Sequence, residues 1–142
     1  MMIELAHEAT PELEDAFARL IPQLSRSATP MDIEQIEQMI SQQSIDLLLF
    51  KDEGEIQGML TLVTFTIPTG VRAWVEDVVV DDAARGKGAG RALVEAACDL
   101  AIQRGAKTVD LTSRPSREAA NRLYQRCGFE ARKTNVYRYA GK

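Results

Sequence analysis

The chain is poor in the residues from which most metal sites and nucleophile triads are built. Histidine occurs once, as His7, and cysteine twice, as Cys98 and Cys127. One histidine cannot form a histidine-rich metal site, and His7 is the only residue that could serve as the histidine of a Ser-His-Asp triad. The two cysteines match no metal spacing and no disulfide framework. We therefore expect no bound metal, and a chain that works in a reducing cytoplasm.

Long apolar runs and an excess of positive charge are also missing. No stretch of about 18 or more apolar residues exists, and the first residues lack the basic region and apolar segment of a signal peptide, which predicts neither a membrane span nor secretion. The net charge is −4, which argues against nucleic acid as a partner because phosphate binding needs a basic surface. The 142 residues predict one domain, residues 1–142, with its own core.

The apolar residues that are present are spaced to predict strands and helices in turn. An initial strand (1–6) precedes a helix that begins at Pro11, and Thr29, Pro30 and Asp32 predict the start of a second helix with the pattern of a capping box. Three strands separated by short turns come next (45–50, 55–67 and 72–80). A helix (90–105), a strand (107–113), another helix (116–128) and a last strand or strand pair (129–139) complete the chain.

This order of elements predicts the fold class. The three middle strands are joined by short turns and should be antiparallel, whereas strands 72–80 and 107–113 flank a helix and should form a parallel, right-handed crossover. We therefore expect an α/β fold, with a mixed, mostly antiparallel sheet of six to seven strands and about four flanking helices.

The most informative segment lies between strand 72–80 and the helix after it. It reads DDAARGKGAGR (81–91), with glycine at positions 86, 88 and 90. Glycine tolerates positive φ and lets a ligand approach the main chain, and a helix start offers free amides and the positive end of its dipole. We interpret the loop as an anion site, most naturally for a phosphate or pyrophosphate. No Gly-Lys-Ser/Thr P-loop is present, and the glycine spacing fits the dinucleotide fingerprint poorly.

Two segments resemble the GNAT superfamily of N-acetyltransferases. RGKGAG (85–90) is similar to the R/Q-x-x-G-x-G/A motif of that family, and ANRLYQRCGFE (120–130) is similar to its second signature, in which a helical tyrosine precedes a Gly-Phe step. The resemblance covers roughly residues 72–139. It implies a sheet that splays between its fourth and fifth strands, so that the pantetheine arm of acetyl-CoA can insert.

The resemblance also assigns roles to individual residues. It implies direct transfer, in a ternary complex, of the acetyl group of acetyl-CoA to a primary amine, with the pyrophosphate bound by the loop amides. Tyr124 would protonate the departing thiolate, and the main chain after the acidic pair would bulge to bind pantetheine, with the amide of Val78 polarising the acetyl carbonyl. The residues expected to bind the cofactor are Val78, Val79, Val80, Arg85, Gly86, Lys87, Gly88, Ala89, Gly90, Arg91 and Asn121.

Acetyl transfer also needs a base, because an amine is almost entirely protonated at neutral pH. The strand offers Glu76 and Asp77, and strand alternation sends their side chains to opposite faces, so that at most one should point into a given cleft. In similar family members the glutamate is the proposed base, which favours Glu76, with Asp77 or a water relay left open. Cys127 has no histidine partner and is interpreted as a small packing residue.

The acceptor stays open on the sequence alone. The first two helices with the loop at 25–32, and the strand ends near 66–73, should form its site, and small amines, amino acids and peptide amines all fit. A homodimer is equally open. Two alternatives come from other classes: a non-catalytic acyl-CoA-binding regulator and a nucleotide-dependent oxidoreductase.

Overall fold

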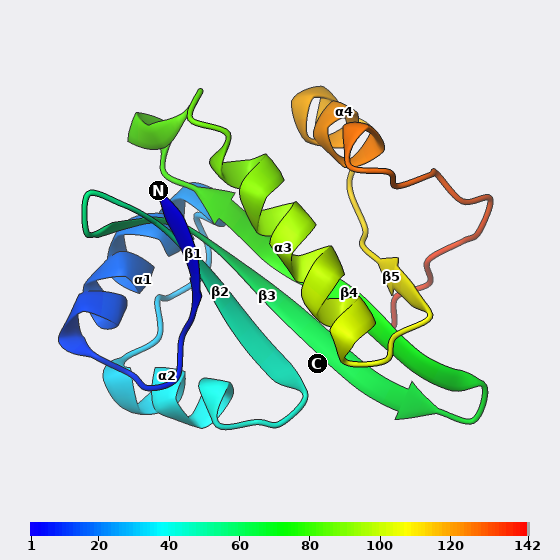
Figure 1. Cartoon of the computed structure of the whole chain (residues 1–142), viewed down its shortest axis with the longest axis horizontal. Helices are drawn as coiled ribbons and strands as arrows, with labels where there is room; N and C mark the ends of the chain where they lie inside the picture. Colours follow the sequence, from blue (N-terminus) through cyan, green and yellow to red (C-terminus); the bar gives the residue numbers. More distant parts are fainter. Residues whose placement is uncertain (142) are drawn as a thin grey trace.

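Five strands form one sheet with helices on both faces in the computed structural model, which describes residues 1–141 (Figure 1). The strands follow chain order in the sheet, β1-β2-β3-β4-β5. Their bounds are β1 Met2–Leu5, β2 Ile45–Asp52, β3 Glu55–Ile67, β4 Gly70–Val80 and β5 Thr108–Asp110. The helices are α1 Pro11–Leu24, α2 Ile33–Ile40, α3 Ala89–Gln103 and α4 Glu118–Arg126, and a short 3-10 turn, η1, spans Asp82–Ala84.

The pairing of the strands confirms the expected mixed sheet. The first four strands pair antiparallel, and β4 and β5 run parallel. An oxidoreductase of the doubly wound type would need a mostly parallel sheet, so this topology removes the structural support for that alternative. The parallel pairing is short: it joins Arg72–Trp74 to Thr108–Asp110 and then ends. The rest of β4 diverges from the chain that follows β5, which is the expected splay between the fourth and fifth strands.

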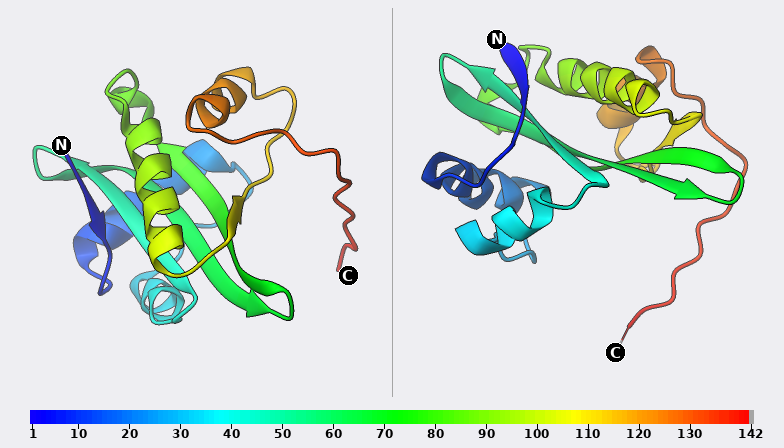
Figure 2. Two further views of the ribbon diagram at one scale, coloured as in Figure 1. Left: turned by 45° about the vertical axis from the view of Figure 1, so that its right-hand side comes forward. Right: turned by 60° about the horizontal axis from the view of Figure 1, so that its bottom comes forward.

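Helices α1 and α2 cover one face of the sheet, and α3 and α4 lie against the other (Figure 2). The Thr10 side chain accepts a hydrogen bond from the amide of Leu13 and begins α1, and Asp32 and Gln35 form the capping box of α2. The apolar stripe of α1 is buried against the β2–β4 side of the sheet. Helix α3 buries Leu93, Val94 and Ala97 against the opposite face.

The expected count of six to seven strands is wrong, because residues 129–141 form no strand. The apolar side chains in this segment are left in solvent: Val136 is 72% exposed, Tyr137 89% and Tyr139 95%. In the left view of Figure 2 the segment runs apart from the sheet, beyond β5. A strand needs a partner for its main-chain hydrogen bonds, and here a cavity lies between this segment and β5.

None of the four α-helices within residues 1–141 combines the length and the apolar character that crossing a membrane requires.

Candidate functional site

Gly86 and Gly88 shape the loop between β4 and α3. Their φ angles are +88° and +77°, in the left-handed region that favours glycine, and a Cβ built on either would meet no atom within 4 Å. Gly88 is the N-cap of α3 and makes no side-chain cap. The first-turn amides of α3 therefore have no side-chain cap and remain available to an anion, as the predicted site requires.

Gly90 serves a different purpose from the other two glycines. A Cβ on Gly90 would lie 3.1 Å from Cδ2 of Leu123, so its missing side chain lets α4 pack against the start of α3. The prediction that all three glycines give access to the main chain is thus too simple. Two of them set the loop conformation, and the third sets the distance between two helices.

The cations predicted to bind the cofactor are all in ion pairs. Arg85 contacts Asp82 at 2.8 Å, Arg91 contacts Glu95 at 3.1 Å, and Lys87 Nζ lies 3.0 Å from Asp52. Exposed ion pairs of this kind contribute about 0–1 kcal/mol to the free energy of unfolding, so a bound phosphate could displace them at little cost. The main-chain amides are the donors in this loop that have no such competitor.

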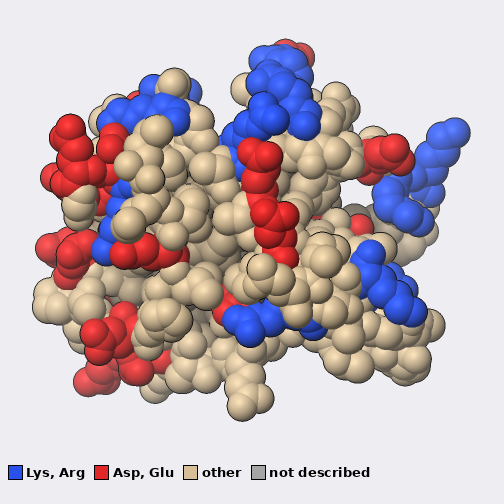
Figure 3. Space-filling view, in the orientation of Figure 1, with Lys and Arg blue, Asp and Glu red and all other residues tan. Residues whose placement is uncertain are grey.

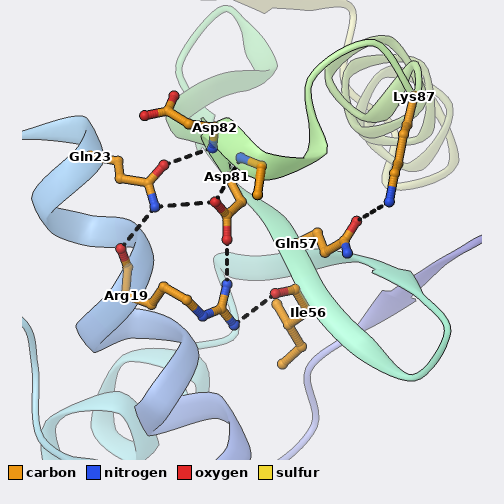
Figure 4. A network of polar contacts seen from close by, with 8 residues as sticks. Arg19, Gln23, Ile56, Gln57, Asp81, Asp82 and Lys87 are labelled. Atoms are coloured by element: carbon orange, nitrogen blue, oxygen red, sulfur yellow. Dashed lines mark hydrogen bonds and ion pairs between the residues drawn. The ribbon is translucent and has the colours of Figure 1, made fainter.

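A network of hydrogen bonds connects the start of the loop to α1 (Figure 4). Asp81 accepts a hydrogen bond from Arg19 Nη1 at 2.8 Å, and the second amino group of Arg19 donates to the carbonyl of Ile56 at 2.9 Å. The side-chain oxygen of Gln23 accepts from the amide of Asp82 at 2.8 Å. A hydrogen bond from the amide of Ala83, supported by Arg19, holds the pKa of Asp81 below its usual value. Helix α1 thereby positions the start of the glycine loop.

A β-bulge interrupts β4 next to the loop. Glu76 pairs with Thr61 and Val79 with Met59, so that Asp77 and Val78 face one residue of β3. Asp77 has φ +48°, which is uncommon for a residue other than glycine. A bulge is therefore present, but it begins at Asp77, within the acidic pair rather than after it, and it leaves Asp77 and Val78 without register partners in either neighbouring strand.

The bulge also overturns the prediction from strand alternation. Glu76 and Asp77 are both exposed, and both line the same cavity of ≈ 150 Å³. The left-handed backbone of Asp77 breaks the alternation of the strand, so its side chain does not point to the opposite face. Both candidate bases are thus brought to the same cavity.

Tyr124 closes this cavity from α4. Its side chain is 8% exposed and packs edge-on against Phe129, with ring centroids 6.0 Å apart. Burial raises the pKa of Tyr124 above 10.0, and the nearby charge of Arg117 offsets part of that effect. The hydroxyl therefore keeps its proton at neutral pH, as a proton donor must.

The remaining predicted residues lie around these groups. Val79 is buried on the α1 side of the sheet, while Val78 and Val80 are partly buried and pack toward α3. Asn121 donates to the carbonyl of Arg114 at 3.1 Å and also lines a larger cavity of ≈ 1090 Å³. Burial raises the pKa of the Cys127 thiol, which suits a packing residue better than a nucleophile.

Several residues of the site carry no signal in the sequence. Leu24 of α1, the segment after β5 and Arg117 meet at the small cavity only because the fold brings them there. Ser113, on the wall of the larger cavity, has a buried hydroxyl without a hydrogen-bond partner in the described part of the chain. No group of three or more histidine, cysteine or carboxylate side chains that could hold a metal exists within residues 1–141.

Known proteins share this fold and are similar in sequence. Residues 7–129 match the acetyltransferase (GNAT) family. The uncharacterized N-acetyltransferase YhdJ of Bacillus subtilis (strain 168) is 29% identical over 122 residues, which cover 82% of this chain and 86% of the relative. An acetyltransferase of Trypanosoma brucei has a TM-score of 0.76 and 25% identity, over 98% of this chain and 100% of the other. The aminoglycoside acetyltransferase meta-AAC0020, from an uncultured soil metagenomic sample, has a TM-score of 0.84 at 18% identity, over 99% and 95% of the two chains.

Proposed function

Because this chain belongs to the acetyltransferase (GNAT) family, we propose that it transfers the acetyl group of acetyl-CoA to a primary amine, directly and within a ternary complex. Residues 1–142 would act as one catalytic domain. The observation that carries the proposal is the meeting of three features at one small cavity: the β4 bulge, the acidic pair and the hydroxyl-bearing Tyr124.

The residues present fit acetyl-CoA. The open amides at the start of α3 would bind its pyrophosphate, with Gly86 and Gly88 providing the space and the exposed cations adding charge. The splay beyond Trp74 leaves room for the pantetheine arm beside β4. The unpartnered hydroxyl of Ser113 would give an amide of that arm a hydrogen-bond partner. When bound, acetyl-CoA supplies an activated acetyl thioester.

The chemistry divides among three groups of the chain. Glu76, or Asp77 beside it, takes a proton from the amine, directly or through water. The nitrogen then bonds to the acetyl carbon, and the amide of Val78 stabilises the negative charge on the acetyl oxygen. As the carbon–sulfur bond breaks, Tyr124 gives its proton to the sulfur, which leaves as a thiol. Glu76 and Tyr124 are thus the proposed base and acid.

The proposal is tested by a screen of amines with acetyl-CoA, monitored by thiol release and by mass spectrometry of the acetylated amine. The library should contain amino acids, amino acid amides, peptides, polyamines and an aminoglycoside, since meta-AAC0020 is named for that class. Thiol release that depends on an amine and yields its acetyl derivative is the expected result. Tight acetyl-CoA binding without turnover of any amine would favour the acyl-CoA-binding regulator instead.

A further inference from the structure

The cavity beside Tyr124 carries opposite charges on its walls. Glu76 and Asp77 line it from β4, and Arg117, the N-cap residue of α4, also lines it. In the described residues 1–141, the Arg117 guanidinium forms no ion pair, either with these two carboxylates or with any other acid. The opposite charges share a cavity without contacting each other.

This separation sets Arg117 apart from the cations of the glycine loop. Arg85, Lys87 and Arg91 each have an acidic partner within 3.1 Å. Arg117 instead stands at the beginning of α4, where positive charge gathers on the surface (Figure 3). The exposed arginines of this region are Arg114, Arg117, Arg122 and Arg126. Of these four, Arg117 is the one that lines the cavity with Tyr124.

We propose that Arg117 selects acceptors that carry a carboxylate next to the reacting amine, which makes free α-amino acids the acceptor class. The inference rests on the proposed acetyl transfer. An amine held toward Glu76 places the carboxylate of the same molecule across the cavity from the acidic pair. The guanidinium can hold that carboxylate through two parallel hydrogen bonds, which is a geometry that Arg favours.

The other walls of the cavity add few apolar groups. Leu24, Val75, Val78 and Leu111 line it together with Thr112, but most of the surface that it exposes is polar. The cavity itself is small, at ≈ 150 Å³. A small free amino acid, whose amino and carboxylate groups are both charged, fits this combination. A peptide N-terminus lacks the carboxylate on its first residue, so it would leave the charge of Arg117 without a partner.

The experiment compares L-leucine with L-leucinamide, and L-methionine with L-methioninamide, because each pair differs only in the carboxylate. The values of kcat/KM are measured for the wild type, Arg117→Gln and Arg117→Lys, with Arg122→Gln as the control on the exposed surface of the same helix. We expect the wild type to prefer the acids. Arg117→Gln should lower kcat/KM for the acids by about 10- to 100-fold, the scale of a lost charge-assisted hydrogen bond, and change the amides by less than about 3-fold. Arg117→Lys should restore part of the lost kcat/KM for the acids. Arg122→Gln should leave kcat/KM unchanged for both the acids and the amides.

The outcomes separate this inference from the function on which it rests. A wild type that acetylates the amides as well as the acids, or a chain that turns over only amines without a carboxylate, overturns the role of Arg117 and leaves acetyl transfer standing. An equal loss for acids and amides in Arg117→Gln also overturns it, because the arginine would then act on acetyl-CoA. Failure to acetylate any amine in the screen contradicts the proposed function, and the inference with it.

Discussion

Leu123 of α4 lies against the Cα of Gly90 at the start of α3, so closely that a Cβ on Gly90 would stand 3.1 Å from Cδ2 of the leucine. This contact joins the two elements on which the site depends. Helix α3 presents the loop amides, and α4 carries Tyr124, the residue after Leu123. The position of the proposed acid relative to the cofactor is therefore set in part by a residue without a side chain.

Gly90→Val should destabilise the protein by overpacking this contact. We expect the free energy of unfolding to fall by about 1–3 kcal/mol, the usual cost of inserting a bulky group into a packed site. Chemical denaturation of Gly90→Val, Leu123→Ala and the double variant measures the coupling between the two positions. The double variant should be more stable than the sum of the single losses predicts, since the smaller side chain makes room for valine; strictly additive losses would mean that the contact is unimportant.

Gly88→Val should abolish acetyl-CoA binding without such a packing effect. The valine would strain a left-handed backbone at φ +77° and place a branched side chain in front of the open amides. Gly54→Val is the matched control, because Gly54 has φ +80°, is equally uncrowded and lies in the β2–β3 turn. Both variants should lose similar stability, and calorimetry should show normal affinity for acetyl-CoA in Gly54→Val alone. Unchanged affinity in Gly88→Val would show that the loop is not the cofactor site.

Arg85→Ala should weaken acetyl-CoA binding less than Gly88→Val does. The guanidinium is exposed and paired with Asp82, so its removal takes away an auxiliary charge and leaves the amides in place. The same calorimetric titration checks this order. A larger loss in Arg85→Ala than in Gly88→Val would transfer the main role in phosphate binding from the main chain to the side chain.

Asp81→Asn should destabilise the protein at neutral pH and have less effect in acid. The pKa of Asp81 is held below 3.8 in the folded state by the amide of Ala83 and by Arg19. A lowered pKa stabilises the fold above the pKa of the unfolded chain, and this contribution is lost as the pH falls through the folded-state pKa. Thermal unfolding from pH 7 to pH 3 should show the gap between wild type and Asp81→Asn closing below about pH 4. Asp82→Asn, which removes only an exposed ion pair, should show no comparable gap.

Tyr124→Phe should lower turnover by about 10²-fold or more, the scale of a lost proton donor, with little change in acetyl-CoA affinity. The ring stays in place against Phe129, so the melting temperature should barely change. Tyr137→Phe is the control, because Tyr137 is 89% exposed and lines neither cavity. Wild-type turnover in Tyr124→Phe would make this tyrosine a packing residue only.

The raised pKa of Tyr124 also has a consequence for stability in alkali. Burial favours the protonated hydroxyl, so the contribution of this group is fully present below the unfolded pKa near 10 and is lost as the pH rises through the higher folded-state value. Wild type should therefore lose stability above pH 10 more steeply than Tyr124→Phe. Parallel alkaline unfolding curves for the two proteins would contradict the effect of burial on this group.

The sequence predicted those parts of the fold that depend on local patterns. The apolar spacing predicted α1 and α3, the short turns between 45 and 80 predicted the antiparallel strands, and the glycines predicted the loop before α3. The prediction of a last strand was wrong because strand pairing depends on residues that are distant in the sequence. Residues 129–139 contain tyrosine and valine in a pattern typical of strands, but that pattern cannot show whether an edge lies within reach.

Motifs in the sequence likewise predicted only part of the candidate site. Tyr124 and the loop were predicted from motifs, whereas Arg117 and Ser113 were not, because neither belongs to a motif and both reach the cavities only through the path of the chain after β5. The acidic pair was predicted with the wrong geometry. Alternation assumes an extended strand, and the left-handed backbone at Asp77 is a consequence of tertiary pairing that strand periodicity does not contain.

The central claim is that the open amides of α3 and the splay beyond Trp74 hold acetyl-CoA. It is tested most directly by thermal unfolding of the wild type and of Gly88→Val with acetyl-CoA, NADPH or ATP in turn, since a ligand that binds the folded state raises the melting temperature. We predict that acetyl-CoA raises the melting temperature of the wild type, that this rise is absent in Gly88→Val, and that neither nucleotide has a comparable effect. A wild type stabilised by NADPH and indifferent to acetyl-CoA would contradict the account.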